Sequence, residues 1–532
     1  MREDGRVKKL LALVLVAACS SSSEPGTPDA AQPAPEGDLP IDPRFQPLVD
    51  QIQTEQAQLG APGVAVLVME NGTITFAHGF GLKNPDAADK VDAGTLFRIG
   101  SVTKMLTTTA LLELEAAGQV GLDDPVTRAI PGFKVAAPAG AEATITVRHL
   151  LTHASGLYDY LDLNPADHSD GFLSSFTTGQ FSSIEYQMAP AGRMWNYSNP
   201  NFSLAGLTVE NVGGAPYRTA MHDRVFAPLG MKRTLFLGDD VIADGNYADG
   251  LTTDDAGMRL VEAPNAYDSP WGRPAGFAFS SVYDLARFVT FLEDGNLAVL
   301  PDAERMAMQS PQINLEMGFG DEQNYGYALF VDKGFFLHDG YHATTLVSHG
   351  GDIPGFAADV YYVPSTKFAI IVLANTDAAH FTDTVVFALE NYAGLSAPTT
   401  APSFPIDPAT FASLAGDYQD DFNVGRVTIT STADGLTISM PDLDAAHIPY
   451  EPKLVAVAPD NFMLGIQGIH IEISFLRDAA GNAEYIRHRA FVAKRTTTLV
   501  AHTVDARALR KELRQDALRE RLATPRHAAL SN

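Results

Sequence analysis

The sequence predicts an α+β protein with two folded domains, and three observations lead to this prediction. The chain has 532 residues, more than a single hydrophobic core usually organises. A long first segment has strand patterns near both of its ends and helical patterns between them. After a linker rich in proline and threonine, short alternating strands follow, separated by turn residues. We therefore expect an antiparallel sheet flanked by helices, with a helical half, and then a small antiparallel β domain.

The first residues have the pattern of a secretory leader. Residues 1–19 begin with basic residues and continue with the apolar stretch from Leu10 to Ala18. Cys19, the only cysteine, ends this stretch in Val-Ala-Ala-Cys, which resembles a bacterial lipobox. The resemblance implies a lipid on Cys19 and a place in the bacterial cell envelope, facing the periplasm or in the outer membrane. A plain signal peptide with a cysteine at its cleavage site is the alternative.

The composition after the leader excludes several kinds of structure and partner. Residues 20–43 are rich in serine, proline, alanine and glycine, which bury too little apolar surface to fold, so we expect a flexible tether. No later apolar run is long enough to span a bilayer. The formal net charge of −27 argues against nucleic acid as a partner, because binding phosphates requires basic surface. The expected partners are a small-molecule or peptide substrate and, through the lipid, a membrane.

Residues 44–395 are expected to form the first domain, because strand pairs lie at both of its ends. Asn71-Gly72 marks a hairpin turn, since both residues tolerate positive φ. The strands from both ends would share one antiparallel sheet with helices on both faces, and residues 102–297 would supply the helical half. The expected elements are a helix from Phe45 to Gln58, strands Gly63–Met69, Thr73–Phe80, Asp359–Val363 and Phe368–Leu373, and a helix from Asp377 to Tyr392.

Residues 396–405 are expected to link the first domain to a second one at residues 406–500. The second domain is predicted to be a small antiparallel sheet or barrel without a catalytic cluster. Residues 501–532 mix both charge signs and predict a peripheral or frayed helix. The strands expected in the second domain are Val427–Thr430, Leu436–Met440, Lys453–Val457, Ile469–Leu476 and Ala490–Lys494.

Ser101 and Lys104 are the candidate nucleophile and its activating base. They begin a strongly helical stretch that runs to about Gly118, and residues three apart share a face of a helix. Lys104 would then lie beneath Ser101, close enough to receive its hydroxyl proton, and burial and the helix dipole would disfavour the ammonium form. The N–H of Ser101 would point outward as an oxyanion donor. Alternatively, the serine caps a helix and the lysine lies on the surface.

Two further segments carry polar groups suited to the same site. Tyr197 and Asn199 form the only Tyr-x-Asn of the chain, so the phenol could relay protons and the amide could hold an acyl side chain. In Ser348-His349-Gly350-Gly351-Asp352 the glycines allow a substrate to approach the backbone. If this is an edge strand facing Ser101, the N–H of Asp352 is the second oxyanion donor and His349 offers a donor at the pocket floor. Alternatively, each segment is an ordinary polar turn.

Ser-x-x-Lys, Tyr-x-Asn and His-Gly-Gly, in this order, resemble the serine β-lactamase and penicillin-binding-protein superfamily. The likeness covers residues 45–394 and is greatest to class C β-lactamases, D-alanyl-D-alanine carboxypeptidases and related esterases. Two supporting phrases, residues 145–157 and Pro274-Ala275-Gly276, are not expected to be catalytic. The resemblance implies a β-lactamase/transpeptidase-like first domain and a lipocalin-like second domain.

The resemblance also implies a reaction. Ser101 would attack an amide or ester carbonyl, Lys104 and Tyr197 would move protons, and water would release the acid, with no metal or organic cofactor. His149 and His153, four residues apart, lack a third metal ligand and are expected to pack a helix. His349 stands where β-lactamases usually carry lysine, which implies an esterase or peptidase and a D-amino-acid peptide or small ester as substrate. A true β-lactamase and a non-catalytic peptidoglycan-binding lipoprotein are the alternatives, and the sequence predicts no oligomeric state.

Overall fold

The structure is a computed structural model that describes residues 37–137, 144–184, 186–254, 257–318, 322–507, 509 and 513. The leader, Cys19, most of the tether and the end of the charged tail lie outside the described residues. No helix within the described ranges is both long and apolar enough to cross a bilayer.

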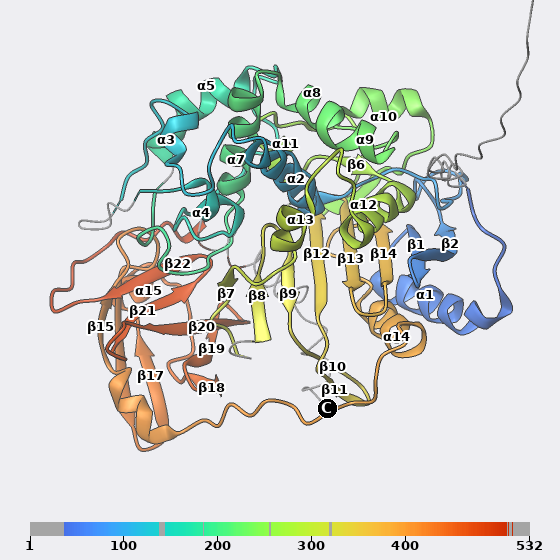
Figure 1. Cartoon of the computed structure of the whole chain (residues 1–532). Helices are drawn as coiled ribbons and strands as arrows, with labels where there is room; N and C mark the ends of the chain where they lie inside the picture. Colours follow the sequence, from blue (N-terminus) through green and yellow to red (C-terminus); the bar gives the residue numbers. More distant parts are fainter. Residues whose placement is uncertain are drawn as a thin grey trace, which may run out of the picture. The chain divides into compact units, whose positions relative to one another are not determined.

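An eight-stranded antiparallel sheet forms the centre of the first domain (Figure 1), in the order β2-β1-β14-β13-β12-β9-β8-β7. Strands from both ends of the domain pair side by side, as predicted, since β1 lies between β2 and β14. Asn71 and Gly72 have φ of 51° and 73°, which confirms the predicted hairpin turn. The strands are β1 Gly63–Glu70, β2 Thr73–Gly81, β7 Ile313–Asn314, β8 Gln323–Tyr325, β9 Phe330–Asp332, β12 Leu346–Ile353, β13 Phe356–Val363 and β14 Phe368–Ala374.

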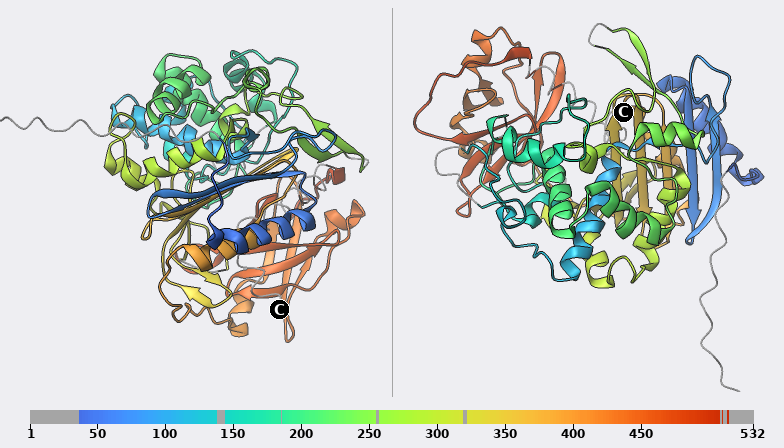
Figure 2. Two further views of the ribbon diagram at one scale, coloured as in Figure 1. Left: turned by 90° about the vertical axis from the view of Figure 1, so that its right-hand side faces the viewer. Right: turned by 90° about the horizontal axis from the view of Figure 1, so that it is seen from above.

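Helices cover both faces of this sheet, as predicted. On one face lie α1 (Gln46–Leu59) and α14 (Thr382–Tyr392), whose apolar side chains share a core with β1 and β14. On the other face α12 (Val282–Asp294) packs against the same two strands, and Figure 2 shows the helices on either side of the sheet. Because both faces are covered, β14 is apolar throughout and β1 is apolar up to its last residue, Glu70.

The last helix of this domain begins later than expected. The sequence predicts a helix from Asp377, but α14 starts at Thr382. The intervening backbone pairs with another segment instead, since Asp377 N–H donates to Leu251 O at 3.2 Å. Glu55 of α1 then accepts the N–H groups of Asp383 and Thr384 at 2.9 and 2.7 Å, which fixes where α14 begins.

The helical half surrounds α2, in which all but three of the side chains are buried. Three small strand pairs lie outside the main sheet: β3 Phe97–Arg98 with β6 Phe279–Ser280, β4 Gly250–Thr253 with β5 Arg259–Glu262, and β10 Phe335–Leu337 with β11 Gly340–His342. The helices of the helical half are α2 Thr103–Ala116, α3 Val126–Ala129, α4 Val147–Leu151, α5 Phe172–Gly179, α6 Phe181–Ile184, α7 Asn199–Gly213, α8 Tyr217–Met221, α9 Ala227–Leu229, α10 Gly238–Asp244, α11 Arg273–Gly276 and α13 Asp302–Met308.

The C-terminal region is a nearly closed antiparallel barrel of eight strands, in the order β17-β16-β15-β22-β21-β20-β19-β18. The barrel nearly closes because β17 binds the segment just before β18: Ile438 N–H donates to Pro452 O and Leu454 N–H donates to Leu436 O. Three of the strands, β15, β19 and β21, were not predicted. The elements are β15 Gly416–Gln419, β16 Arg426–Thr432, β17 Gly435–Ser439, α15 Pro441–Ala445, β18 Val455–Ala458, β19 Asn461–Ile466, β20 Ile469–Arg477, β21 Ala483–His488 and β22 Phe491–Arg495.

The charged tail differs from the prediction where the structure describes it. Leu509 and Leu513 are 4% and 1% exposed and belong to the core of the barrel, although a peripheral or frayed helix was expected. Their spacing of four is that of residues on one face of a helix, which allows two apolar side chains to be buried together.

Candidate active site

Ser101 and Lys104 lie together at the start of α2. Ser101 belongs to a short 3₁₀ turn, Gly100–Val102, and Lys104 follows one turn later, with Nζ 2.9 Å from Ser101 Oγ. Lys104 is fully buried, and its Nζ also lies 2.8 Å from Asn199 Oδ1 and 2.7 Å from Ala275 O. Three oxygen atoms thus surround one amine, and two of them can only accept hydrogen bonds.

The backbone of β12 packs directly against the turn that carries Ser101. Gly100 has a φ of +48°, and a Cβ there would lie 2.5 Å from Asp352 N. A Cβ on Gly351 would lie 2.0 Å from Ile99 O and 3.1 Å from Ser101 N. Only glycine permits this approach at both positions, and it places the amides of Ser101 and Asp352 beside each other. Two neighbouring N–H groups of this kind suit an oxyanion hole.

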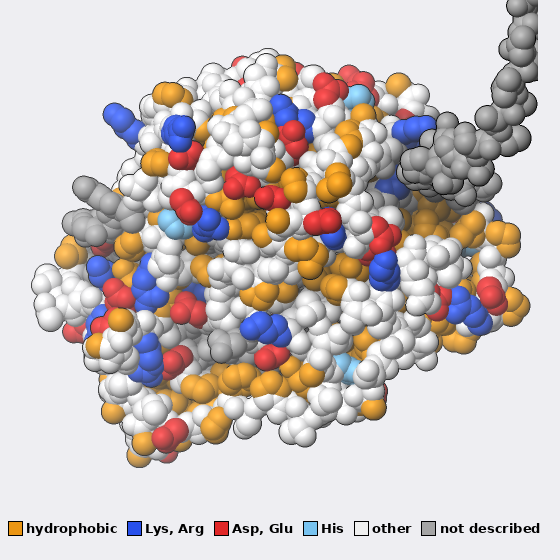
Figure 3. Space-filling view, viewed as in Figure 1, with side chains coloured by type: hydrophobic (Ala, Val, Ile, Leu, Met, Phe, Trp, Pro, Cys, Tyr) orange, Lys and Arg blue, Asp and Glu red, His pale blue; other side chains and the backbone are white. Residues whose placement is uncertain are grey.

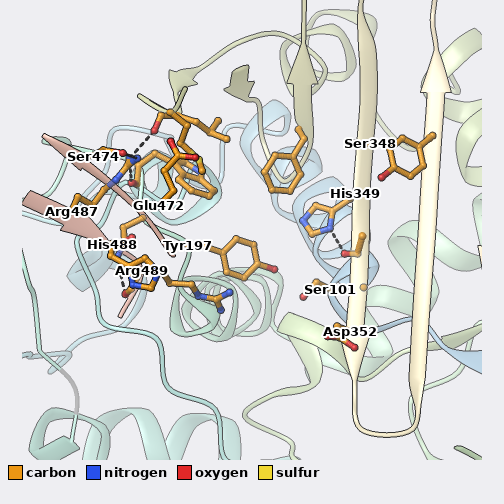
Figure 4. Close-up of a pocket in the computed structure, with 18 residues that line it drawn as sticks. Ser101, Tyr197, Ser348, His349, Asp352, Glu472, Ser474, Arg487, His488 and Arg489 are labelled. Atoms are coloured by element: carbon orange, nitrogen blue, oxygen red, sulfur yellow. Dashed lines mark hydrogen bonds between the residues drawn. The ribbon is translucent and has the colours of Figure 1, made fainter. Parts of the chain in front are cut away.

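β12 is an edge strand only in part. It pairs with β13 along its length, and its first residues, Leu346–Ser348, also pair with β9. From His349 onwards the side that faces away from β13 meets the Ser101 turn instead of another strand. Ser101, His349, Gly350, Gly351 and Asp352 all line one pocket, part of which Figure 4 shows with Ser101 and Asp352 facing the same space.

Tyr197 lies over Lys104 in a loop that precedes α7. Its ring centroid is 5.0 Å from Lys104 Nζ and 4.1 Å from the ring of His153. The predicted role of Asn199 differs from its position, because its amide oxygen contacts Lys104 and the residue is not part of the pocket wall. As the first residue of α7, Asn199 is directed inward by the helix, so it meets the base rather than an acyl group.

His349 lines the pocket but does not offer the donor that the sequence predicts. Its Nδ1 lies 2.6 Å from Gly350 O, which can only accept, and its Nε2 lies 3.1 Å from the hydroxyl of Tyr325. Both ring nitrogens are therefore used within the protein. The residue is 2% exposed, and burial lowers the pKa of His349 to about 3, so the ring is neutral.

The two histidines of the first supporting phrase help to build the site. His149 caps α4, since its Nδ1 accepts the N–H of Thr146 at 3.2 Å. His153 follows this helix, stacks on Tyr197, and accepts the N–H of Ser198 at 3.1 Å. Burial holds the pKa of His153 well below its usual range. Among the described residues, no cluster of three His, Cys, Asp or Glu side chains could hold a metal ion.

The barrel contributes to the pocket wall, although the sequence predicts no catalytic cluster there. The pocket residues from the barrel are Glu472, Ser474, Arg487, His488 and Arg489. The last three lie at or next to a tight turn between β21 and β22. Charged residues at a hairpin tip usually face solvent, so no signal in a single sequence marks them as part of a site.

The chain matches known proteins in sequence. A family model described as Beta-lactamase matches residues 48–393. Protein flp of Staphylococcus aureus (strain MW2) is 27% identical over 394 residues, covering 73% of this chain and 72% of that protein. Esterase EstB of Burkholderia gladioli is 33% identical over 200 residues, covering 36% of this chain and 50% of the esterase.

Solved structures show the same architecture. The octameric penicillin-binding protein homologue from Pyrococcus abyssi has a TM-score of 0.56 at 22% identity and covers 84% of this chain and 99% of its own. The D-amino acid amidase from Ochrobactrum anthropi SV3 has a TM-score of 0.53 at 25% identity and covers 65% of this chain and 98% of its own.

Proposed function

This chain belongs to the beta-lactamase family, and on that basis we propose that it is a serine hydrolase that forms an acyl-enzyme on Ser101 and hydrolyses an ester or amide. The observation that carries the proposal is the short distance of 2.9 Å between Ser101 Oγ and the buried Lys104 Nζ. A serine hydroxyl is a weak nucleophile until a neighbouring base accepts its proton.

The partners of Lys104 explain how the amine can act as that base. A neutral amine has two N–H groups and one lone pair. If it donates its N–H groups to Asn199 Oδ1 and Ala275 O, the lone pair is directed to Ser101 Oγ. Complete burial favours this neutral form, because it penalises an ammonium ion. Ser101 then donates its proton to Lys104 as Oγ attacks the carbonyl carbon.

The tetrahedral intermediate carries negative charge on the former carbonyl oxygen. The amides of Ser101 and Asp352 are the proposed donors to this oxygen. Tyr197, next to Lys104, then passes a proton to the leaving alkoxide or amine. In the second half of the reaction a water molecule attacks the ester on Ser101. Lys104 and Tyr197 accept a proton from this water and return one to Ser101 Oγ as the acid leaves.

The pocket favours an uncharged group beside Ser101. His349 is neutral and its ring nitrogens bind Gly350 and Tyr325, so it provides no fixed cation for a substrate carboxylate. The two arginines that line the pocket bind protein groups: Arg487 donates to Trp195 O and Leu315 O, and Arg489 pairs with Asp159. The wall includes the apolar side chains of Trp195, Leu315 and Phe330. A small ester, or an amide of an amino acid with an apolar side chain, fits this lining better than a penicillin, whose carboxylate needs a cationic partner. The names of esterase EstB and of the D-amino acid amidase support the same two substrate classes.

The surface is consistent with a small-molecule substrate. On the face shown in Figure 3, Lys and Arg side chains are interspersed with Asp and Glu rather than gathered into a basic patch. Such a face offers no continuous basic surface to the phosphates of a nucleic acid.

Labelling with a fluorophosphonate probe, read by intact mass spectrometry, tests the nucleophile and the base. We expect the wild type to gain one adduct, Ser101→Ala to gain none, and Lys104→Ala to react about 10²- to 10⁴-fold more slowly, which is the usual contribution of a general base. The exposed residues Ser183 and Lys134 supply matched controls, because Ser183→Ala and Lys134→Ala should label like the wild type.

Undiminished labelling of Ser101→Ala or Lys104→Ala would show that the assignment is wrong. A wild type that does not react would favour the non-catalytic lipoprotein. Turnover of p-nitrophenyl esters, D-amino acid amides and nitrocefin then ranks the substrate classes. A kcat/KM for nitrocefin above that for the esters and amides would favour the true β-lactamase.

A further inference from the structure

The tip of one barrel hairpin reaches the catalytic tyrosine. Arg489 forms the turn between β21 and β22, and its guanidinium carbon lies 4.6 Å from the ring centroid of Tyr197. Figure 4 shows its side chain extending beside Tyr197, on the side of the pocket opposite the β12 strand. The backbone of the same residue is also held, since Asn196 Nδ2 donates to Arg489 O at 3.4 Å. A residue of the second domain thus lies among the groups proposed to move protons.

A continuous series of contacts connects this arginine to the nucleophile. Arg489 forms an ion pair with Asp159, which is 6% exposed. The other oxygen of Asp159 accepts the N–H of Asn199 at 2.7 Å. Asn199 Oδ1 in turn lies 2.8 Å from Lys104 Nζ, and Lys104 Nζ lies 2.9 Å from Ser101 Oγ. The first contact in this series joins residues 330 positions apart in the chain.

We propose that Arg489 is a positioning residue of the active site. The C-terminal barrel then contributes a residue that the reaction requires. The inference rests on the proposed function. Arg489 keeps Asp159 oriented, and Asp159 holds the first N–H of α7, so that Asn199 stays on Lys104. At the same time its guanidinium stabilises negative charge on the Tyr197 oxygen and opposes positive charge on the Lys104 amine.

Both electrostatic effects favour the deprotonated forms of Lys104 and Tyr197. The ring of Tyr197 has several charged or titratable neighbours besides Arg489, and each comes from a different element. They are Lys104 of α2, His153 after α4, Asp159 in the following loop through its pair with Arg489, Tyr325 of β8 and His349 of β12. His153 and His349 are neutral because burial lowers the pKa of each, which leaves Lys104, Arg489 and Asp159 to set the charge of the site.

Other contacts hold the barrel in place independently of Arg489. Met188 and Met194 pack against Leu476, Tyr485 and Val492 of the barrel. The ring of Tyr186 stacks on Phe422 with centroids 3.9 Å apart, and Arg193 binds Glu484 at 2.9 Å. The buried Arg487 donates to Trp195 O and Leu315 O at 2.9 and 2.7 Å. Loss of the Arg489 side chain therefore removes a contact with the site without undocking the barrel.

The test measures acylation of the full-length chain by a p-nitrophenyl ester as a function of pH. Arg489→Met keeps the side-chain stem but removes the charge, and we expect kcat to fall about 10- to 100-fold, as for a misplaced catalytic group. The rising limb of the pH profile should move to higher pH by about one unit. Without Arg489, the carboxylate of Asp159 is unpaired and makes removal of a proton from Lys104 and Tyr197 less favourable. Asp159→Asn leaves the cation and should move the limb to lower pH.

Two further variants make the result specific. Arg489→Lys keeps the charge but not the planar fork, so it should restore the pH profile but only part of kcat. Arg193→Met is the matched control, because Arg193 also pairs with a carboxylate across the same domain boundary and its guanidinium lies over Tyr485, 5.4 Å from the ring centroid. We expect Arg193→Met to keep the wild-type kcat and pH profile.

The inference is overturned if Arg489→Met behaves like the wild type, if Arg193→Met loses as much activity, or if Arg489→Met and Asp159→Asn shift the pH limb in the same direction. Fluorophosphonate labelling separates this failure from a failure of the proposed function. If the wild type is labelled at Ser101 and the Arg489 variants are labelled equally fast, only the role of Arg489 is lost. If the wild type is not labelled at all, the proposed hydrolase activity itself is wrong.

Discussion

Replacing Gly351 with alanine tests whether the backbone of β12 forms half of an oxyanion hole. Gly351 is not among the residues with positive φ, so alanine can adopt its backbone conformation. The added Cβ would, however, lie 2.0 Å from Ile99 O, whereas such contacts are not shorter than 3.0 Å. The strand and the Ser101 turn must therefore separate by about 1 Å, a displacement that typically costs about 10²-fold in rate.

We expect Gly351→Ala to reduce kcat about 10²- to 10³-fold, the usual cost of losing one oxyanion donor, and to lower the free energy of unfolding by about 1–3 kcal/mol through overpacking. Acylation by a p-nitrophenyl ester under stopped flow and urea denaturation measure the two effects. Gly350→Ala is the matched comparison, because its Cβ would have ordinary contacts of 3.7 Å with Asp359 Oδ1 and 3.8 Å with Ala358 O. The oxyanion-hole argument fails if Gly351→Ala retains wild-type kcat or if Gly350→Ala loses as much.

Two other predictions concern protonation. Because burial lowers the pKa of His349 to about 3, the ¹³Cε1 resonance of His349 should stay that of a neutral ring from about pH 5 to 8, and titration near 6.5 would contradict the assigned hydrogen bonds. Burial raises the pKa of Glu55 from 4.5 to about 7, so the folded state binds more protons than the unfolded state in this interval. The free energy of unfolding should then fall by up to about 3 kcal/mol as pH rises from 4.5 to 7, and Glu55→Gln should abolish this dependence in urea titrations at several pH values; an unchanged slope would refute it.

Local sequence signals were sufficient to place Ser101 beside Lys104 and to predict much of the fold. The spacing of Ser101 and Lys104 predicts that both lie close together on one helix face, and in the structure Lys104 Nζ is 2.9 Å from Ser101 Oγ. Asn71 and Gly72 form the predicted turn, and the apolar strands of both chain ends share one sheet. These features depend on residues a few positions apart or on long apolar runs, which a sequence displays directly.

Other features depend on distant contacts that no local pattern contains. The start of α14 moved from Asp377 to Thr382 because that backbone pairs with Leu251 instead. β15 and β21 were missed because strands with charged residues resemble loops until their neighbours are known, whereas β19 is a mainly apolar strand without a charged residue. His349 was expected to face the substrate as a donor, but Tyr325 and the carbonyl of Gly350 occupy its nitrogens.

The sequence by itself determined the proximity of Ser101 and Lys104 and the hairpin turn at Asn71-Gly72, because a helix turn and a tight hairpin are set by neighbouring residues. The tertiary structure alone decided which groups surround Lys104, the charge of His349 and the position of Arg489 beside Tyr197. These outcomes depend on burial and on contacts between segments hundreds of positions apart, and both arise only when the complete chain is folded.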